Sequence, residues 1–148
     1  MLLMEKMDAA FPNQIAYCYA HNVIVETATA SSWKNFIQQR IRWASKAKNY
    51  TSWSIKCTLL LVFMVNLIAA ILLILSLADL DYVKMYLIYI AIKSVGELPF
   101  MLHVSMFFNK QRLIRWFIPS QIVHTIYTVV AAFFGLFTQY EWKGRKVN

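Results

Sequence analysis

One uninterrupted apolar run constrains this chain more than any other feature of its sequence. Between Cys57 and Ala78 there is no charged residue, and Lys56 and Asp79 close the run on its two sides. About 22 positions suffice for a helix to cross a bilayer at ~1.5 Å rise per residue. With 59% hydrophobic residues in 148 and a mean hydropathy of +0.49, the chain is too apolar for a soluble domain of this size. The run therefore predicts a transmembrane helix.

A second apolar segment, Val83 to Phe108, is interrupted by polar and helix-breaking residues. Lys93 and Glu97 are four positions apart, so they can pair on one helical face and lower the cost of burying either charge. Gly96 and Pro99 favour a kink or a break. The charged pair is either a structural ion pair in a helix bundle or a polar lining for a substrate or lipid path.

A third apolar segment, Phe117 to Phe137, completes a predicted bundle. Asn109 to Trp116, which precedes it, predicts a second interfacial helix because Lys110, Arg112 and Arg115 alternate with apolar residues. We place the bundle at residues 54–140, with spans near 54–78, 83–108 and 117–138. We expect two to three of these helices to cross the membrane.

The net charge of +8 also bears on the partners. A strongly basic chain can bind nucleic acid, but the cations here cluster beside apolar runs, which is the positive-inside pattern of membrane proteins. We therefore expect membrane lipids and no nucleic acid. The basic segment before the first span contains six cations and no acid: Lys34, Arg40, Arg42, Lys46, Lys48 and Lys56.

This basic segment predicts a helix from Trp33 to about Lys48, with Ser31 and Ser32 as candidate N-caps. On such a helix Gln39, Arg42 and Trp43 share one face. The neighbouring apolar face could rest on lipid; it carries Ile37, Ile41 and Ala44. One interpretation is a basic amphipathic helix on anionic lipid with a Trp anchor. The other is a binding face, because a guanidinium grips phosphate oxygens and an indole stacks on sugar rings.

The sequence of this helix resembles a known family signature. Gln39-Arg40-Ile41-Arg42-Trp43 is similar to the Q-x-x-R-W motif of membrane-bound family 2 glycosyltransferases, relatives of cellulose, hyaluronan and ceramide-glucose synthases. Tyr140 to Arg145 resembles the W-K/R-G-R tail of several bacterial members. Such enzymes run from a catalytic GT-A domain through an interfacial helix into C-terminal membrane helices. The resemblance covers most of this chain but only the C-terminal part of a family member.

The resemblance implies an activity. It predicts transfer of a sugar from a nucleotide-sugar donor to a polysaccharide or lipid-linked acceptor at the cytosolic membrane face. The implied substrate-binding residues are Gln39, Arg40, Arg42 and Trp43. A divalent metal, Mg or Mn, is expected for the full enzyme, with its ligands and the catalytic Asp residues outside this chain. The fragment alone is therefore expected to be inactive.

One apparent metal-binding motif does not fit the architecture that the resemblance implies. Asp79-Leu80-Asp81 spells the D-x-D pattern with which family members hold a metal and a diphosphate. That pattern belongs at a strand end of the cytosolic domain, whereas this one caps a transmembrane helix on what should be the opposite side. We reject it as a metal site.

Residues 1–30 are interpreted as the C-terminal edge of a GT-A domain. Met1 to Phe11 predicts a short amphipathic helix. Ile15 to Ala20 and Val23 to Thr27 predict two short strands around a turn. The expected fold is a mainly α membrane protein with this α/β remnant, an interfacial helix at residues 31–53, the bundle, and a basic tail at residues 141–148.

The expected location is the inner (plasma) membrane. The predicted helix that carries Gln39 to Trp43, called the motif helix below, and the Lys110 to Arg115 loop would lie in the cytosol. Asp79 to Lys84 would then face outward, and a third full span would place the basic tail outside, against the positive-inside rule. Either one segment is re-entrant or the tail is an exception. The alternative function is a small stand-alone membrane scaffold or lipid-binding protein.

Overall fold

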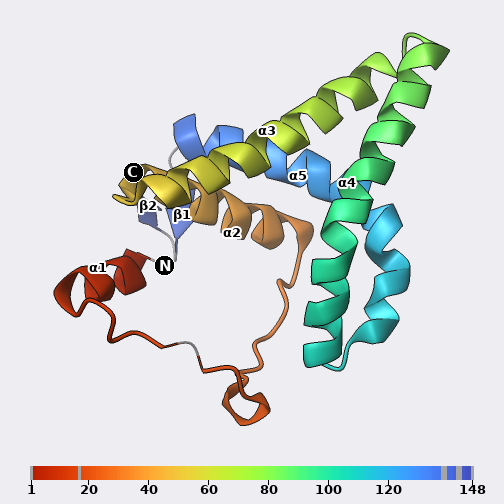
Figure 1. Ribbon diagram of the computed structural model, residues 1–148. Coiled ribbons are helices and arrows are strands. Elements are labelled where there is room, and N and C mark those ends of the chain that lie inside the picture. Colours follow the sequence, from red (N-terminus) through yellow and green to blue (C-terminus); the bar gives the residue numbers. More distant parts are fainter. Residues whose placement is uncertain (1, 17, 138–139, 143–144, 148) are drawn as a thin grey trace. The chain divides into compact units, whose positions relative to one another are not determined.

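The computed structural model describes residues 2–16, 18–137, 140–142 and 145–147, and these are mainly helical (Figure 1). The chain divides into two compact units. The first comprises Met1–Phe63 with Val130–Asn148, and the second comprises Met64–Val129. Helices α3 (Trp53–Leu75) and α5 (Phe117–Phe137) each contribute residues to both units.

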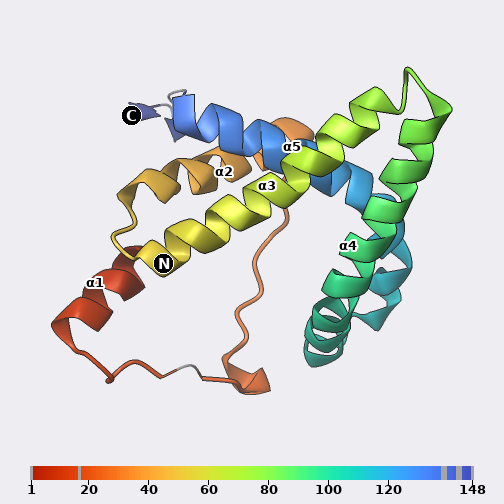
Figure 2. The same ribbon diagram turned by 45° about the horizontal axis from the view of Figure 1, so that its top comes forward.

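The N-terminal part of the first unit confirms the predicted amphipathic helix but not the predicted strands. Helix α1 spans Leu2–Ala10. The described residues of 15–27 contain only the short 3-10 helix η1, His21–Val23, within an otherwise irregular segment (Figure 2). Ala20 and Ile24 have extended dihedral angles, yet no neighbouring strand accepts or donates a ladder hydrogen bond to the described residues there. The two predicted strands were therefore wrong.

Helix α1 is attached to the beginning of α3 through one carboxylate. Glu5 Oε1 accepts hydrogen bonds from the Thr51 N–H at 2.8 Å, the Thr51 hydroxyl at 2.6 Å and the Ser52 N–H at 2.6 Å. The Thr51 hydroxyl bond, followed by the Ser52 N–H bond, lowers the pKa of Glu5 below 4.5. The carboxylate therefore satisfies donors that precede the first turn of α3.

The helix predicted from Trp33 to about Lys48 is confirmed. Helix α2 spans Trp33–Ser45 and continues as the 3-10 helix η2, Lys46–Asn49. It begins where predicted, because the Ser32 side chain accepts a hydrogen bond from the Asn35 N–H at 3.2 Å. The Asn35 amide also donates to the Ser31 hydroxyl at 2.9 Å. Both candidate capping serines therefore hold the first turn.

The apolar face of α2 packs on protein where we expected that it could rest on lipid. Ile41 is buried. A Cβ placed on Gly135 of α5 would lie 2.7 Å from the Ala44 Cβ and 2.8 Å from the Ser45 N. The two helices therefore approach so closely that only glycine fits at position 135 without a shift.

The described tail residues form two short strands in the same unit. Strands β1 (Tyr140–Trp142) and β2 (Arg145–Val147) pair antiparallel, with Tyr140 opposite Val147. Strand β1 contacts α2. The described start of the tail is thus a neighbour of α2, while Lys143 and Gly144 of the tail pattern lie outside the described residues.

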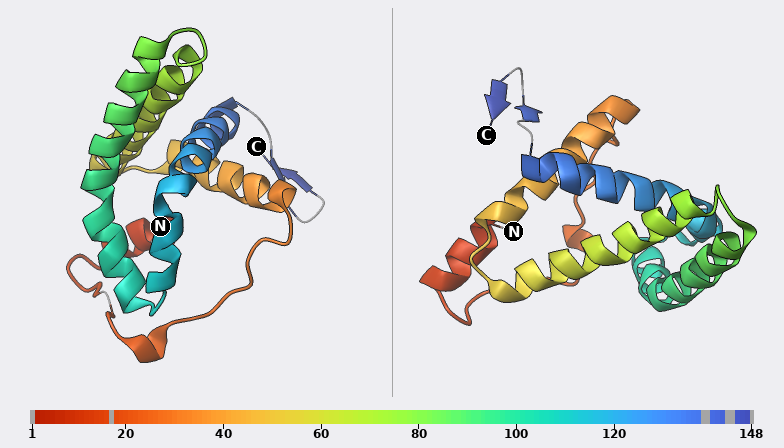
Figure 3. Two further views of the ribbon diagram at one scale, coloured as in Figure 1. Left: turned by 90° about the vertical axis from the view of Figure 1, so that its right-hand side faces the viewer. Right: turned by 90° about the horizontal axis from the view of Figure 1, so that it is seen from above.

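The second unit is helical. It contains the second half of α3, all of α4 (Leu80–Phe107), the 3-10 helix η3 (Gln111–Trp116) and the first part of α5 (Figure 3). Among the described residues, three helices are long and apolar enough to cross a membrane, which confirms the three predicted apolar segments and indicates a membrane protein. The segment 109–116, predicted to form a second interfacial helix, contains the 3-10 helix η3 at Gln111–Trp116.

Helix α4 runs through Gly96 and Pro99 without interruption, so of the two predicted alternatives, a kink or a break, the break is excluded. Proline removes one backbone donor and leaves one carbonyl without its intrahelical partner, which long apolar helices tolerate when the rest of the helix is supported. Asp79 caps the helix by accepting a hydrogen bond from the Asp81 N–H at 3.0 Å. Asp81 then pairs with Lys84 at 2.9 Å.

Burial in the second unit is the reverse of that in a soluble protein. Large apolar side chains point outward, as at Ile92 (69% exposed) and Val95 (73% exposed) on α4. Most of the buried side chains are polar: Asn66, Lys93, Ser94, Ser105, Gln121 and Thr125. An apolar exterior around a polar interior is the arrangement expected when lipid surrounds the helices.

Candidate functional site

The motif helix borders an open cavity of about 400 Å³. One wall is the segment 28–31, which enters α2, and the other is the polar face of the helix itself. Gln39 and Arg42, two of the predicted site residues, line this cavity together. Asn35 and Gln38 lie beside them, so four helical side chains at i, i+3, i+4 and i+7 form the polar wall.

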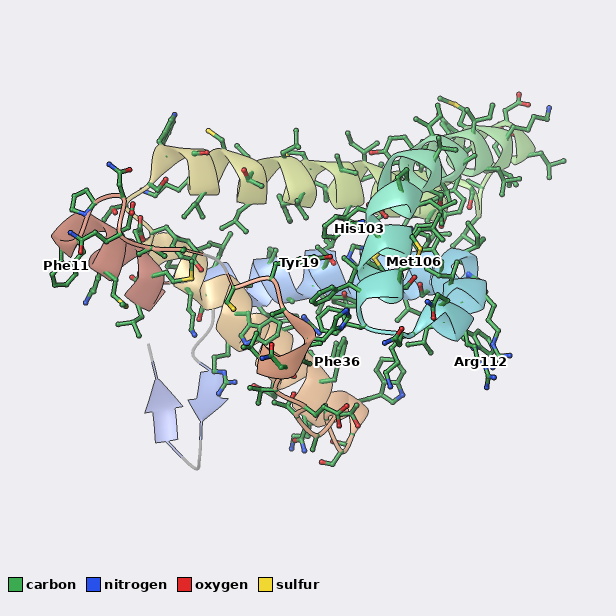
Figure 4. All side chains as sticks on the ribbon, turned by 60° about the horizontal axis from the view of Figure 1, so that its bottom comes forward. Phe11, Tyr19, Phe36, His103, Met106 and Arg112 are labelled. Carbon is green, nitrogen blue, oxygen red and sulfur yellow. The ribbon has the colours of Figure 1, made fainter. Side chains whose placement is uncertain are left out.

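The other two predicted site residues form a separate pair. The Arg40 guanidinium lies over the Trp43 ring at 4.5 Å and over the Phe36 ring at 4.9 Å. Neither Arg40 nor Trp43 lines the cavity. Figure 4 shows Phe36 on the helix that carries this cluster. The two aromatic rings hold the Arg40 guanidinium by cation–π contact. The same contact holds the ring of Trp43, which is half-exposed.

Asn35 and Gln38 were missed from the sequence. The spacing that groups Gln39 with Arg42 also groups Asn35 with Gln39 and Gln38 with Arg42, so one further helical turn would have included them. Gln38 Oε1 is buried and has no hydrogen-bond partner among the residues that the structure describes. A ligand donor at this position would satisfy that acceptor.

The cavity offers amides, a guanidinium and short hydroxyls, and no carboxylate lines it. Donors of this kind suit the oxygens of a phosphate or a sugar and do not suit a divalent metal, which needs carboxylate or carbonyl ligands. Within the described ranges, His, Cys, Asp and Glu side chains form no group of three that could hold a metal ion. Asp79 and Asp81 are engaged in the cap and ion pair at the start of α4.

The predicted Lys93–Glu97 pair is present and includes a third partner. Lys93 Nζ lies 3.0 Å from Glu97 Oε1 and donates to Gln121 Oε1 at 2.5 Å. Gln121 Nε2 donates back to Glu97 Oε2 at 2.8 Å. The side chain of Lys93 is only 3% exposed, so its ammonium group is shielded from water and is paired with the Glu97 carboxylate. This closed triad joins α4 to α5.

Two further polar contacts join helices within the second unit. The Tyr89 hydroxyl donates to the Val65 carbonyl at 2.9 Å, which links α4 to α3. The Thr125 hydroxyl donates to Asn66 Oδ1 at 3.5 Å, which links α5 to α3. Asn66 lies within the uncharged run of α3, so its side chain uses this contact in place of water. All three helices are therefore joined by polar groups.

Comparison with protein-family models found no match. Searches of curated proteins and of solved structures also found none.

Proposed function

We propose that this chain is the C-terminal membrane portion of a family 2 glycosyltransferase. It would act with a GT-A catalytic domain that transfers a sugar from a nucleotide-sugar donor to a polysaccharide or lipid-linked acceptor. The observation that supports this most directly is the shared cavity of Gln39 and Arg42, beside the helix that leads into the first apolar span. The contact between β1 and α2 adds support, since both segments carry the resemblance.

The proposed roles follow the chemistry of each side chain. Arg42 would grip the diphosphate of the donor or product bidentately, with Gln39 and the amides of Asn35 and Gln38 alongside. Trp43 would contact the acceptor sugar. Arg40 would hold the Trp43 ring in place by cation–π contact. Because no carboxylate lines the cavity, these residues do not fit the divalent metal that the resemblance implies. The Mg or Mn ligands and the catalytic Asp are proposed to lie outside this chain.

The decisive experiment measures sugar transfer by the enzyme that carries this segment together with its catalytic domain. Arg42→Ala should lower turnover about ten- to a hundredfold, since a charged hydrogen bond to phosphate contributes about 1.5–3 kcal/mol. Arg42→Lys should not restore activity, because an ammonium lacks the planar fork. The present chain alone should release no nucleoside diphosphate from a nucleotide sugar above a no-protein control.

Lys48→Ala is the matched control, because Lys48 lies in η2 directly after the motif helix and does not line the cavity. It should leave turnover nearly unchanged. Equal losses in Arg42→Ala and Lys48→Ala, at equal membrane insertion, would identify the helix as a lipid anchor and favour a stand-alone membrane scaffold or lipid-binding protein.

The proposal also assigns sides of the inner membrane. Ser45 and Gln111 would be cytosolic, and Leu80 would be outside, because cations flank the first two positions and acids flank the third. Single cysteines at these three positions, treated with a membrane-impermeant reagent, test the assignment in spheroplasts. Labelling of Leu80→Cys together with Ser45→Cys from the same side would show that α3 does not cross.

A further inference from the structure

A second cavity, of about 330 Å³, lies entirely within the second unit. It is formed where α4 ends, η3 turns back and α5 begins. Its lining is almost wholly apolar and includes ten residues: Met101, Val104, Ser105, Phe108, Lys110, Leu113, Ile114, Trp116, Phe117 and Ser120. Its size falls at the lower end of small-molecule sites, which span about 300–1,000 Å³.

The polar groups of this lining narrow the choice of ligand. The Ser105 hydroxyl donates to the Leu102 carbonyl at 2.8 Å, and the Ser120 hydroxyl donates to the Phe117 carbonyl at 2.8 Å. Both donors are therefore used within their own helices. Lys110 is the one cation of the lining, and no ion pair involves it among the described residues. The cavity thus combines an apolar interior with a single positive charge.

The position of Lys110 is set by the backbone. Asn109 adopts a left-handed conformation with φ of 53° and ends α4 in a Schellman motif. The Asn109 N–H donates to the Met106 carbonyl at 3.1 Å, and the Lys110 N–H donates to the Ser105 carbonyl at 2.8 Å. The Lys110 carbonyl then accepts from the Leu113 N–H at 2.9 Å, which starts η3. Lys110 is therefore fixed at the junction of α4 and η3, which contact each other.

The surroundings favour an anionic ligand at the membrane interface. No Asp or Glu occurs between Glu97 and Glu141. Two further cations, Arg112 and Arg115, follow Lys110 in the same short segment. Trp116 is 58% exposed at the cavity, in the position of an interfacial aromatic residue at the start of an apolar helix. Positive charge beside an apolar helix end attracts anionic lipid headgroups.

We propose that the α4–η3–α5 cavity binds an anionic phospholipid, with an acyl chain against the apolar lining and the phosphate on Lys110. A zwitterionic lipid could place its acyl chain in the same space, but its ammonium group would oppose the local positive charge. The site is separate from the motif-helix cavity and does not depend on the glycosyltransferase proposal. Failure of either proposal leaves the other standing.

The test uses the whole chain in vesicles and reads Trp116 directly. The other four tryptophans, at positions 33, 43, 53 and 142, are changed to Phe. Fluorescence is then measured while brominated phosphatidylglycerol or brominated phosphatidylcholine replaces a small fraction of an unbrominated phosphatidylcholine bilayer. We expect phosphatidylglycerol to quench Trp116 at about a fivefold lower mole fraction, the effect of one cation at the surface. Equal quenching by the two lipids would overturn the proposal.

Lys110→Ala and Arg112→Ala provide a matched pair. Both remove one positive charge from the same short segment, but only Lys110 lines the cavity. Figure 4 shows Arg112 extending away from the helices. Lys110→Ala should abolish most of the preference for phosphatidylglycerol, and Arg112→Ala should retain most of it. Equal losses would mean a diffuse surface attraction and would refute the site.

Ser120→Phe tests where the acyl chain lies, since a ring at this lining position should fill the space. It should weaken quenching by brominated phosphatidylglycerol at least severalfold, with the helical circular dichroism signal unchanged. Unchanged quenching in this variant would show that the chain does not enter the cavity. A loss of helical signal is resolved with Ser120→Leu, for which the same reduction is expected.

Discussion

The two units hold their helices together in different ways. In the first, α2 meets α5 by close approach, with Gly135 facing the backbone of Ala44 and Ser45. In the second, α4 meets α5 through the Lys93–Glu97–Gln121 triad, in which Lys93 and Gln121 are buried. Lipid removes most of the hydrophobic driving force between membrane helices, so small residues and polar side chains are the two remaining means of association. Helix α5 uses both, at different points along its length.

The largest expected effect comes from breaking the triad on one side. Glu97→Leu leaves Lys93 buried without its carboxylate and should lower the free energy of unfolding by about 3–5 kcal/mol. The double variant Lys93→Met with Glu97→Leu should be less damaging than the single one, since no charge remains unpaired. Unfolding in mixed micelles, followed by circular dichroism, measures both. A double variant as unstable as the single one would show that the triad contributes more than charge compensation.

The close contact is tested next with two glycines in different surroundings. Gly135→Ala should cost about 1–3 kcal/mol, because its methyl group would overlap Ala44. Gly96→Ala, inside α4, meets no atom within 4 Å and should stabilise by about 0.5–1 kcal/mol. The same unfolding assay compares them. Equal responses would mean that α2 and α5 do not approach closely.

A smaller effect is expected where backbone conformation alone sets the structure. Asn109→Val places a β-branched residue at φ of 53° and should cost about 1–2 kcal/mol, while Asn109→Gly should be nearly neutral. If the turn orients Lys110, the valine variant should also reduce the phosphatidylglycerol preference of Trp116. A valine variant with full stability would show that the left-handed turn is not needed.

The smallest effect concerns Glu5, which is partly exposed. Its folded pKa is lowered from 4.5, so its hydrogen bonds to Thr51 and Ser52 are fully present above pH 4.5. They are lost as the pH falls through the lower folded value. Amide hydrogen exchange at Ser52, corrected for the intrinsic pH dependence, should therefore accelerate below that pH. Glu5→Gln should exchange at a rate that no longer changes with pH in this window, and an unaltered profile would exclude the contact.

The sequence predicted the elements whose signals are local. Long apolar segments located the three long helices, and Ser31 and Ser32 located the start of α2. The spacing of Lys93 and Glu97 predicted their ion pair. The strands at 15–20 and 23–27 were wrong because β propensity does not supply a partner strand.

Contacts between distant positions were not predictable in the same way. Gln121 closes the triad from another helix, and Gly135 meets Ala44 across most of the chain. In the candidate site, helical spacing brought Gln39 and Arg42 together, but nothing local in the sequence indicated that segment 28–31 would form the facing wall.

The contact between Ala44 and Gly135 has a consequence for the order of biosynthesis. The ribosome releases α2 before any of the three long helices, whereas Gly135 lies near the end of the last one. Until α5 is synthesised and inserted, Ala44 has no Gly135 to pack against, and the apolar side of α2 remains on the bilayer surface or on a chaperone. The motif helix is thus made before the three long helices, and it reaches its final packing only after the last of them.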